Sequence, residues 1–304
     1  MTGAADGWSR WPAPAKLNLF LHIVGRRDDG YHLLQSVFQL LDRGDAVHLH
    51  VREDGRIRRV RGATGVDEVD DLAVRAARAL QAASACPHGV DIAIDKHIPL
   101  GGGLGGGSSD AATVLVALNL LWATGLEPAQ LARLGLALGA DVPVFVHGHS
   151  AWAEGIGEQL TPLALAPRWY VVVDAGCSVP TRELFAAPEL TRTAAPLTIA
   201  RFRAGAVTGN AFEPLVRARF PGVATALDWL GGFGVARLSG SGGCSFVAVE
   251  SAAQAEAIAQ QCPAPLRAWV AQGVDRSPLL AARAQWLDAR RDGPPAPRAG
   301  PAPG

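Results

Sequence analysis

Residues 99–110 read PLGGGLGGGSSD, and six of the seven residues from Gly101 to Gly107 are glycine. A glycine in an ordered element costs roughly 0.5–1 kcal/mol relative to alanine, so this run needs a physical reason. Bare backbone lets several N–H groups approach an anion, and positive φ angles let them converge on it. We therefore predict a phosphate-binding loop made of Pro99, Leu100, Gly101, Gly102, Gly103, Leu104, Gly105, Gly106, Gly107, Ser108 and Ser109.

The segments on either side of the loop support this interpretation. Val90, Ile92 and Ile94 recur at every second position, which predicts a strand before the loop. Residues 109–122 are mostly apolar and have the length of a buried helix, and serine and aspartate at 108–110 are favoured at helix N-termini. The partial positive charge of that helix end would face the same anion.

Two other interpretations of the glycine run are weaker, and a third is excluded. An empty flexible linker would not be expected between a strand and a core helix. Gly101, Gly103 and Gly106 satisfy the G-x-G-x-x-G pattern of dinucleotide-binding folds, with Glu127 about 20 residues further on. However, Glu127 lies at a predicted helix start rather than at a strand end. A Walker A loop is excluded because no Gly-Lys-Ser/Thr follows the glycines.

The lysines are unusually few. Among the 28 basic residues the only lysines are Lys16 and Lys96, and the others are arginines. Lysine is a compact point charge and arginine a broad planar fork, so these two positions suggest a need for lysine itself. Lys16 shares the polar face of a predicted strand with Asn18, and Lys96 directly precedes the glycine loop. The alternative for each is an ordinary solvated charge.

Asp141 is the carboxylate that best suits phosphoryl transfer. It stands between Leu138-Gly139-Ala140, where a helix is predicted to end, and Val142-Pro143, where we expect a turn and then a strand. Transfer of a phosphoryl group to an alcohol uses a carboxylate to accept or orient the hydroxyl proton and a lysine to hold phosphate charge. The alternative is that Asp141 only caps the turn.

The rest of the chain indicates an α+β fold. Strands and helices mix without the strict alternation of doubly wound folds. A Gly/Ser-rich segment, SGSGGCSF from Ser239, precedes a late strand and is either a tight turn or a second loop near phosphate. We expect strands at residues 15–24, 31–41, 46–51, 90–94, 169–174 and 244–249, and helices at residues 71–83, 109–122, 128–139 and 252–261.

Composition excludes several classes of protein. Acidic and basic residues number 28 each, which removes any net electrostatic reason to bind nucleic acid or anionic lipid. The most apolar stretch, residues 111–126, is short for a membrane span. No signal peptide is visible, and four cysteines without metal-ligand spacing favour reduced thiols in the cytoplasm.

Taken together, these segments resemble the GHMP kinase superfamily. The resemblance extends over residues 11–280 and is strongest from Pro14 to Asp45, from Pro99 to Trp122 and from Leu138 to Glu158, with SGSGGCSF as a fourth segment. The opening segment, with Tyr31-His32, is most similar to superfamily members that phosphorylate a cytidine-diphosphate-linked methylerythritol in isoprenoid-precursor synthesis.

The resemblance implies a two-domain fold with the active site in the cleft between an ATP-binding domain at residues 11–160 and a second domain at residues 161–287. The glycine loop would hold the ATP phosphates, with Lys96 within reach of the nucleotide. Asp141 would be the catalytic base and Lys16 its charge-stabilising partner. Mg²⁺ would accompany ATP rather than occupy a dedicated protein site.

The resemblance also implies a substrate site. Tyr31 and Phe185 would sandwich the cytosine ring, His32 would form a hydrogen bond to the base, and Asn18 would position the polyol. The acceptor would be the tertiary 2-hydroxyl, and the products its phosphate and ADP. The expected partner is this small molecule, with no nucleic acid or membrane, and the protein would be a monomer or weak homodimer.

Two features depart from the family pattern. Asp71 stands where asparagine is expected near the adenine, and the Pro/Gly-rich residues 288–304, which we expect to be a disordered tail, have no counterpart. A GHMP-type kinase with another acceptor, a non-catalytic nucleotide-binding relative and an NAD-binding oxidoreductase remain alternatives.

Overall fold

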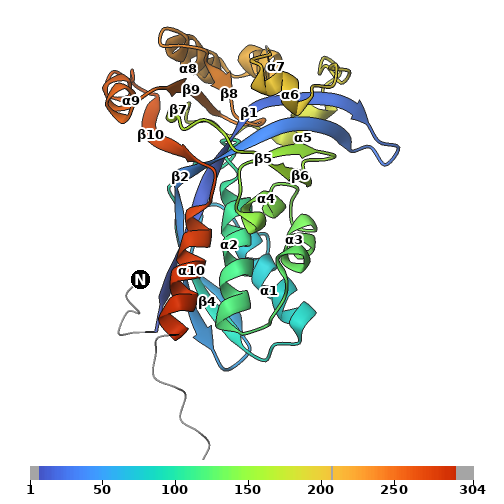
Figure 1. The fold of residues 1–304 in the computed structure, drawn as a ribbon, viewed down its shortest axis with the longest axis vertical. Helices are drawn as coiled ribbons and strands as arrows, with labels where there is room; N and C mark the ends of the chain where they lie inside the picture. Colours follow the sequence, from blue (N-terminus) through green and yellow to red (C-terminus); the bar gives the residue numbers. More distant parts are fainter. Residues whose placement is uncertain (1–6, 207, 292–304) are drawn as a thin grey trace, which may run out of the picture.

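The computed structural model describes residues 7–206 and 208–291, which form a mixed α/β structure with ten strands and ten helices (Figure 1). The strands are β1 (Ser9–Arg26), β2 (His32–Arg52), β3 (Ile57–Arg61), β4 (Gly89–Asp95), β5 (Ala151–Glu154), β6 (Gln159–Pro162), β7 (Trp169–Asp174), β8 (Arg237–Leu238), β9 (Cys244–Val249) and β10 (Arg267–Val274). The helices are α1 (Leu72–Ser84), α2 (Gly106–Leu121), α3 (Pro128–Leu136), α4 (Val142–His147), α5 (Thr181–Ala186), α6 (Ile199–Arg203), α7 (Glu213–Arg219), α8 (Pro221–Gly231), α9 (Ala252–Ala259) and α10 (Pro278–Arg291).

The strands form one sheet in the order β3-β4-β2-β10-β7-β9-β8, with β1 and β5 also paired to β2. Only the β3–β4 pair is parallel among the strand pairs of the described residues. A dinucleotide-binding fold requires a mainly parallel sheet around the glycine loop. The predicted α+β class is therefore confirmed, and the dinucleotide-binding fold is excluded.

The long hairpin β1–β2 runs through the whole molecule (Figure 1). Its turn contains Asp29-Gly30, as predicted, and Gly30 has φ +89°, which favours glycine. The prediction of two separate strands at 31–41 and 46–51 was wrong, because β2 continues through both. Gly44 makes this possible: a Cβ there would lie 2.0 Å from the Ala13 carbonyl oxygen, so only glycine fits against β1 where the pairing register shifts.

Helix α2 forms the centre of the larger hydrophobic core, where α1 and the sheet pack against it. Ten consecutive residues, Ser109 to Leu118, are buried. The helix begins at Gly106, three residues before the predicted start, because Gly105 takes the N-cap position with φ +73°. The glycine run thus ends inside the first turn of the helix, which brings its N-terminal amides to the loop.

The second half of the chain forms the upper part of the molecule in Figure 1, where helices α8 and α9 contact the sheet of β7, β9 and β10. Helix α10 then returns to the first half and packs its buried Leu279 and Ala282 into the larger core. The division into 11–160 and 161–287 stays a prediction. Of the expected tail at 288–304, residues 288–291 are helical, which corrects that prediction, and the remainder lies outside the described residues. No described helix is long and apolar enough to cross a membrane.

Candidate active site

Lys16 lies on β1 in a closely fitted polar environment. Its side chain is only 3% exposed, and its Nζ donates to Asn18 Oδ1 at 2.6 Å and to the Gly103 carbonyl oxygen at 3.1 Å. Asn18 is held in turn by Ser36, whose Oγ accepts from Asn18 Nδ2 at 2.7 Å. A buried ammonium needs such partners, and they leave its position little freedom. This burial rules out a solvated strand charge, while the catalytic role of Lys16 stays a prediction.

Asp141 forms an ion pair with Lys16 at the wall of the pocket, with Oδ2 3.2 Å from Nζ. The residues after it form helix α4 rather than the predicted turn and strand, because Val142 to Val146 are buried as one helical turn against α2 and α3. Asp141 occupies the N-cap position of α4, yet its side chain makes no capping hydrogen bond. Its carboxylate remains about one-third exposed. The exposed part of the carboxylate can thus meet a substrate hydroxyl while Lys16 holds Oδ2.

The glycine loop lies beside this pair. Gly101, Gly103 and Gly105 have φ between +68° and +75°. A Cβ at Gly105 would lie 2.9 Å from the Phe145 ring and 3.2 Å from Lys16 Cε, so this glycine lets the lysine lie close to the loop. The loop residues from Pro99 to Ser108 line a small cavity of about 210 Å³.

The segment that begins SGSGG, residues 239–244, holds the glycine loop in place through hydrogen bonds to its carbonyl oxygens. Gly243 N donates to Gly101 O, Cys244 N to Gly102 O and Ser239 Oγ to Gly103 O, at 3.0–3.1 Å. A Cβ on Gly103 would lie 2.0 Å from the Ser239 carbonyl oxygen. Some of the glycines are thus required by packing between two loops, a role that the phosphate argument did not anticipate.

Lys96 lines the small cavity but is already paired. Its Nζ binds Asp45 and, at 2.7 Å, Asp110 of α2. Asp45 also accepts the backbone N–H groups of His97 and Ile98, so it ties β2 to the start of the loop. Burial raises the pKa of Asp110 to about 7 against the attraction of Lys96, and the nearby Asp45 charge adds to the rise. Burial lowers the pKa of Lys96, but the two carboxylates outweigh it and the net shift is upward.

A second, larger cavity of about 870 Å³ opens beside the Lys16–Asp141 pair. Gly103, Gly105 and Ser108 line both cavities, so the two spaces meet at the glycine loop. Other lining residues come from both halves of the chain and include Asn18, Tyr31, His32, Asp141, Thr181, Phe185 and Ser241. One cavity can therefore hold phosphates while the other holds an acceptor of considerable size.

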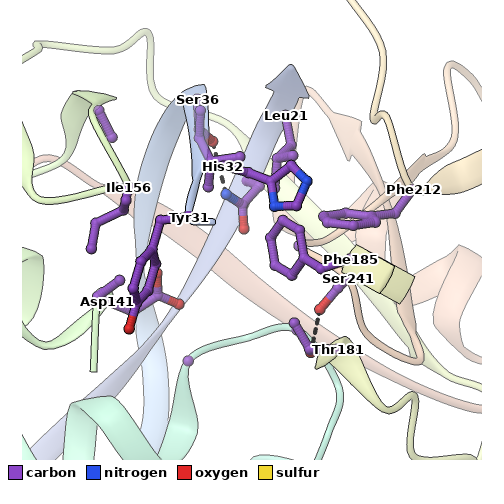
Figure 2. Close-up of a pocket in the computed structure, with 18 of the residues that line it drawn as sticks. Leu21, Tyr31, His32, Ser36, Asp141, Ile156, Thr181, Phe185, Phe212 and Ser241 are labelled. Atoms are coloured by element: carbon purple, nitrogen blue, oxygen red, sulfur yellow. Dashed lines mark hydrogen bonds between the residues drawn. The ribbon is translucent and has the colours of Figure 1, made fainter. Parts of the chain in front are cut away.

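The residues predicted to bind the base line this larger cavity: Tyr31, His32 and Phe185. Tyr31 lies apart from the other two, so they do not enclose a site for a ring in the absence of a ligand. Figure 2 shows Tyr31 near Asp141 and Ile156 on one side of the pocket, and His32, Phe185 and Phe212 on the other. His32 stacks on Phe185 at 4.9 Å between ring centroids, while Tyr31 is 59% exposed. Tyr31 and Phe185 therefore stand apart, with open space between them.

Several contributing residues were missed by sequence reasoning. Arg192 donates from Nε to His32 Nε2 at 3.0 Å, and Asp45 and Asp110 hold Lys96. Arg192 is one arginine among many, and no local pattern separates it from the others. For Asp110 a signal was present, since it directly follows the loop serines.

Asp71 and Glu127 each stand at the N-terminus of a helix and have structural roles there. Asp71 caps α1 by accepting from Ala73 N and pairs with Arg59 at 2.8 Å, next to Leu72 of the small cavity. Glu127 precedes helix α3, and its backbone N–H donates to the Gln130 side chain. It lies at no strand end, so the ribose-binding role required by the dehydrogenase interpretation has no support.

Comparisons with known proteins agree with this geometry. The family model described as GHMP kinases N terminal domain matches residues 71–149, and that described as GHMP kinases C terminal matches residues 193–268. A protein of Halorhodospira halophila named 4-diphosphocytidyl-2-C-methyl-D-erythritol kinase is 60% identical over 90% of this chain and 95% of its own. A protein of the same name from Xanthomonas axonopodis pv. citri is 59% identical over 91% of this chain and 94% of its own.

Solved structures show the same fold. A crystal structure of 4-(cytidine 5'-diphospho)-2C-methyl-D-erythritol kinase is 35% identical, covers 88% of this chain and 100% of its own, and gives a TM-score of 0.74. A homoserine kinase from Cytophaga hutchinsonii, 15% identical, covers 91% of this chain and 98% of its own with a TM-score of 0.66, which is a likeness of fold alone. The sequence resemblance is therefore confirmed: this chain belongs to the GHMP kinase family, among the 4-diphosphocytidyl-2-C-methyl-D-erythritol kinases.

Proposed function

We propose that this chain transfers the γ-phosphoryl group of ATP to the 2-hydroxyl of 4-diphosphocytidyl-2-C-methyl-D-erythritol, a step of non-mevalonate isoprenoid-precursor synthesis. Its relatives at about 60% identity are named 4-diphosphocytidyl-2-C-methyl-D-erythritol kinase. The single observation that supports it most is the placement of the Lys16–Asp141 pair, 3.2 Å apart, where the phosphate-sized cavity meets the larger one. A donor phosphate and an acceptor hydroxyl in these cavities would meet at this pair.

Each residue of the pair has a chemical role in this proposal. Asp141, about one-third exposed, accepts or orients the proton of the attacking hydroxyl. Lys16 keeps its ammonium fixed through Asn18 and Gly103, and it stabilises the charge of the transferred phosphoryl group. The amides of the glycine loop and the N-terminus of α2 bind the remaining phosphate oxygens.

The residues present fit a nucleotide that brings its own cation. The Ser108 side chain lies where both cavities meet and can contribute one oxygen ligand. The described part of the chain contains no group of three or more His, Cys, Asp or Glu side chains placed to hold a metal. Mg²⁺ bound with ATP would neutralise phosphate charge.

The base-binding roles also belong to this proposal. Tyr31 and Phe185 would close on the two faces of the cytosine, and stacking would supply the binding energy. Asn18 contacts the Lys16 ammonium and lines the larger cavity, so it would position both the lysine and the polyol. Lys96 would act from its ion pair with Asp45 and Asp110, at the wall of the small cavity.

The test is an ADP-release assay with 4-diphosphocytidyl-2-C-methyl-D-erythritol, with homoserine and mevalonate as control acceptors at equal concentration. We expect turnover with the cytidylyl substrate to exceed that with either control by at least about 10³-fold, because a pocket that pairs with a base rejects compounds lacking it. Faster turnover of a control would favour the GHMP-type kinase with another acceptor. A cytoplasmic location and a monomeric or weakly dimeric state remain predictions, which cell fractionation and analytical ultracentrifugation would check.

A further inference from the structure

Arg192 contacts His32, which lines the larger cavity, and its guanidinium is held by several hydrogen bonds. Nη1 donates to Leu190 O at 3.0 Å, and Nη2 donates to Phe185 O at 2.9 Å and to Ala187 O at 2.7 Å. The Nε N–H donates to His32 Nε2 at 3.0 Å, so four of the five guanidinium N–H groups are bonded within the described residues. Among the described residues no carboxylate pairs with Arg192, so its charge is directed at backbone carbonyls and at this histidine.

The contact with Arg192 determines where the proton of His32 lies. A guanidinium can only donate hydrogen bonds, so Nε2 must accept and cannot carry a proton. The ring is then neutral, and its single N–H is on Nδ1. Burial lowers the pKa of His32, and the nearby charges of Arg192 and of Arg26 on β1 lower it further, which also favours the neutral ring.

The Nδ1 atom is the part of His32 that a ligand can reach. His32 lines the larger cavity, and Nδ1 has no hydrogen-bond partner among the described residues and is not one of their fully buried unpartnered atoms. Figure 2 shows the ring beside Phe185, at the side of the pocket where the base would stack. The cavity wall therefore presents a fixed hydrogen-bond donor to the base.

We propose that Arg192 is a positioning residue that selects cytosine over uracil by keeping the His32 proton on Nδ1, an inference that rests on the proposed function. Cytosine N3 is a hydrogen-bond acceptor, whereas uracil N3 carries a proton and donates. A fixed Nδ1–H satisfies the cytosine edge and leaves two donors facing each other with uracil. Without Arg192, His32 can move its proton to Nε2 and accept from uracil instead.

The proposal is tested first by comparing the cytidine substrate with its uridine counterpart in Arg192→Leu and Arg192→Lys. Arg192→Leu should raise KM for the cytidine substrate about tenfold, change kcat less than about threefold and reduce the cytidine preference about tenfold or more. Arg192→Lys can still donate to Nε2 and should keep the preference within about threefold of wild type. Unchanged preference in Arg192→Leu, or equal loss in Arg192→Lys, overturns the proposal.

Arg219→Leu is the matched control. Arg219 binds Glu189 at 3.2 Å and so contacts the same segment of the chain, but it does not contact His32. It should leave the cytidine preference unchanged. A loss of preference equal to that of Arg192→Leu would assign the effect to support of the 185–192 segment and overturn the tautomer argument.

A second measurement requires no turnover and reads the tautomer in the wild-type protein, with one variant used only to assign the signals. Carbon and nitrogen NMR of wild-type protein with labelled histidine identifies the tautomer, and the His32 signals are those lost in His32→Asn. The Nδ1–H form supports the proposal, and the Nε2–H form or a charged ring at neutral pH overturns it. If wild-type protein turned over neither nucleotide form, the proposed function would fail, while the tautomer would still decide the role of Arg192.

Discussion

The two ends of the larger cavity differ in how far they are assembled without a ligand. At the phosphate end, Lys16 is 3% exposed and is held by Asn18, Gly103 and Asp141 within 3.2 Å. At the base end, Tyr31 is 59% exposed and stands apart from Phe185 (Figure 2). The charged groups that stabilise a transition state gain most from being fixed beforehand, whereas aromatic side chains can close on a ring as it binds. The comparison predicts large effects on turnover at one end and effects on binding at the other.

The largest effect is expected from Asp141→Asn, which keeps the shape of the side chain and removes its ability to accept a proton. We expect kcat to fall by about 10²–10⁴-fold with little change in nucleotide affinity. ADP release at saturating substrate and calorimetric titration of an ATP analogue measure the two quantities. Glu127→Gln, an acidic residue before α3 and outside both cavities, should retain full activity. Near-normal turnover in Asp141→Asn would remove the carboxylate from the mechanism.

Gly103→Ala tests whether the phosphate end is fixed by packing between the two loops. The new methyl would lie 2.0 Å from Ser239 O, in a backbone with φ +75°. Strain and clash together should lower the free energy of unfolding by about 2–4 kcal/mol. Gly125→Ala is the control, because Gly125 has φ +69° but nothing within 4 Å of a Cβ. It should cost only about 1 kcal/mol in chemical denaturation. Equal losses in the two variants would show that the loops do not constrain each other.

A smaller effect is expected at the base end from Tyr31→Ala. We expect KM for the cytidylyl substrate to rise about tenfold while kcat and Tm stay close to wild type, because an exposed ring contributes stacking energy only when a base is bound. Val235→Ala, another exposed apolar residue, serves as the control and should change neither KM nor Tm. A drop in kcat at unchanged KM would show that the base end takes part in the chemical step.

The smallest effect, on the free energy of unfolding, is expected from Asp110, which lies in α2 and pairs with Lys96. Its pKa of about 7 in the folded protein is above its ordinary value of 3.8, so between these values the folded state holds a proton that the unfolded state has lost. Stability from this group is therefore complete at low pH and is lost as the pH rises through 7. Between pH 6 and pH 8 the wild type should lose about 1 kcal/mol relative to Asp110→Asn in urea denaturation. Parallel pH curves for the two proteins would mean that Asp110 is ionised throughout.

Features that depend only on residues close together in the sequence could be predicted from it. Alternating residues predicted β1 and β4, and the glycine run predicted the loop that brings the amides of α2 to a cavity. The scarcity of lysine singled out Lys16, and the chemistry of phosphoryl transfer singled out Asp141, which together form the pair at the site. Each of these features depends on backbone geometry or residue chemistry within a short segment.

Only the tertiary structure decided which distant segments meet. Arg192 lies 160 residues from His32, and Ser239 lies 136 residues from Gly103, and nothing local to either member of these pairs indicates the other. The sequence likewise did not predict that β2 is continuous, because a glycine such as Gly44 is typical of a turn. Its close packing against β1 is seen only in the structure. Such contacts follow from the pairing order of the sheet, which local periodicity does not specify.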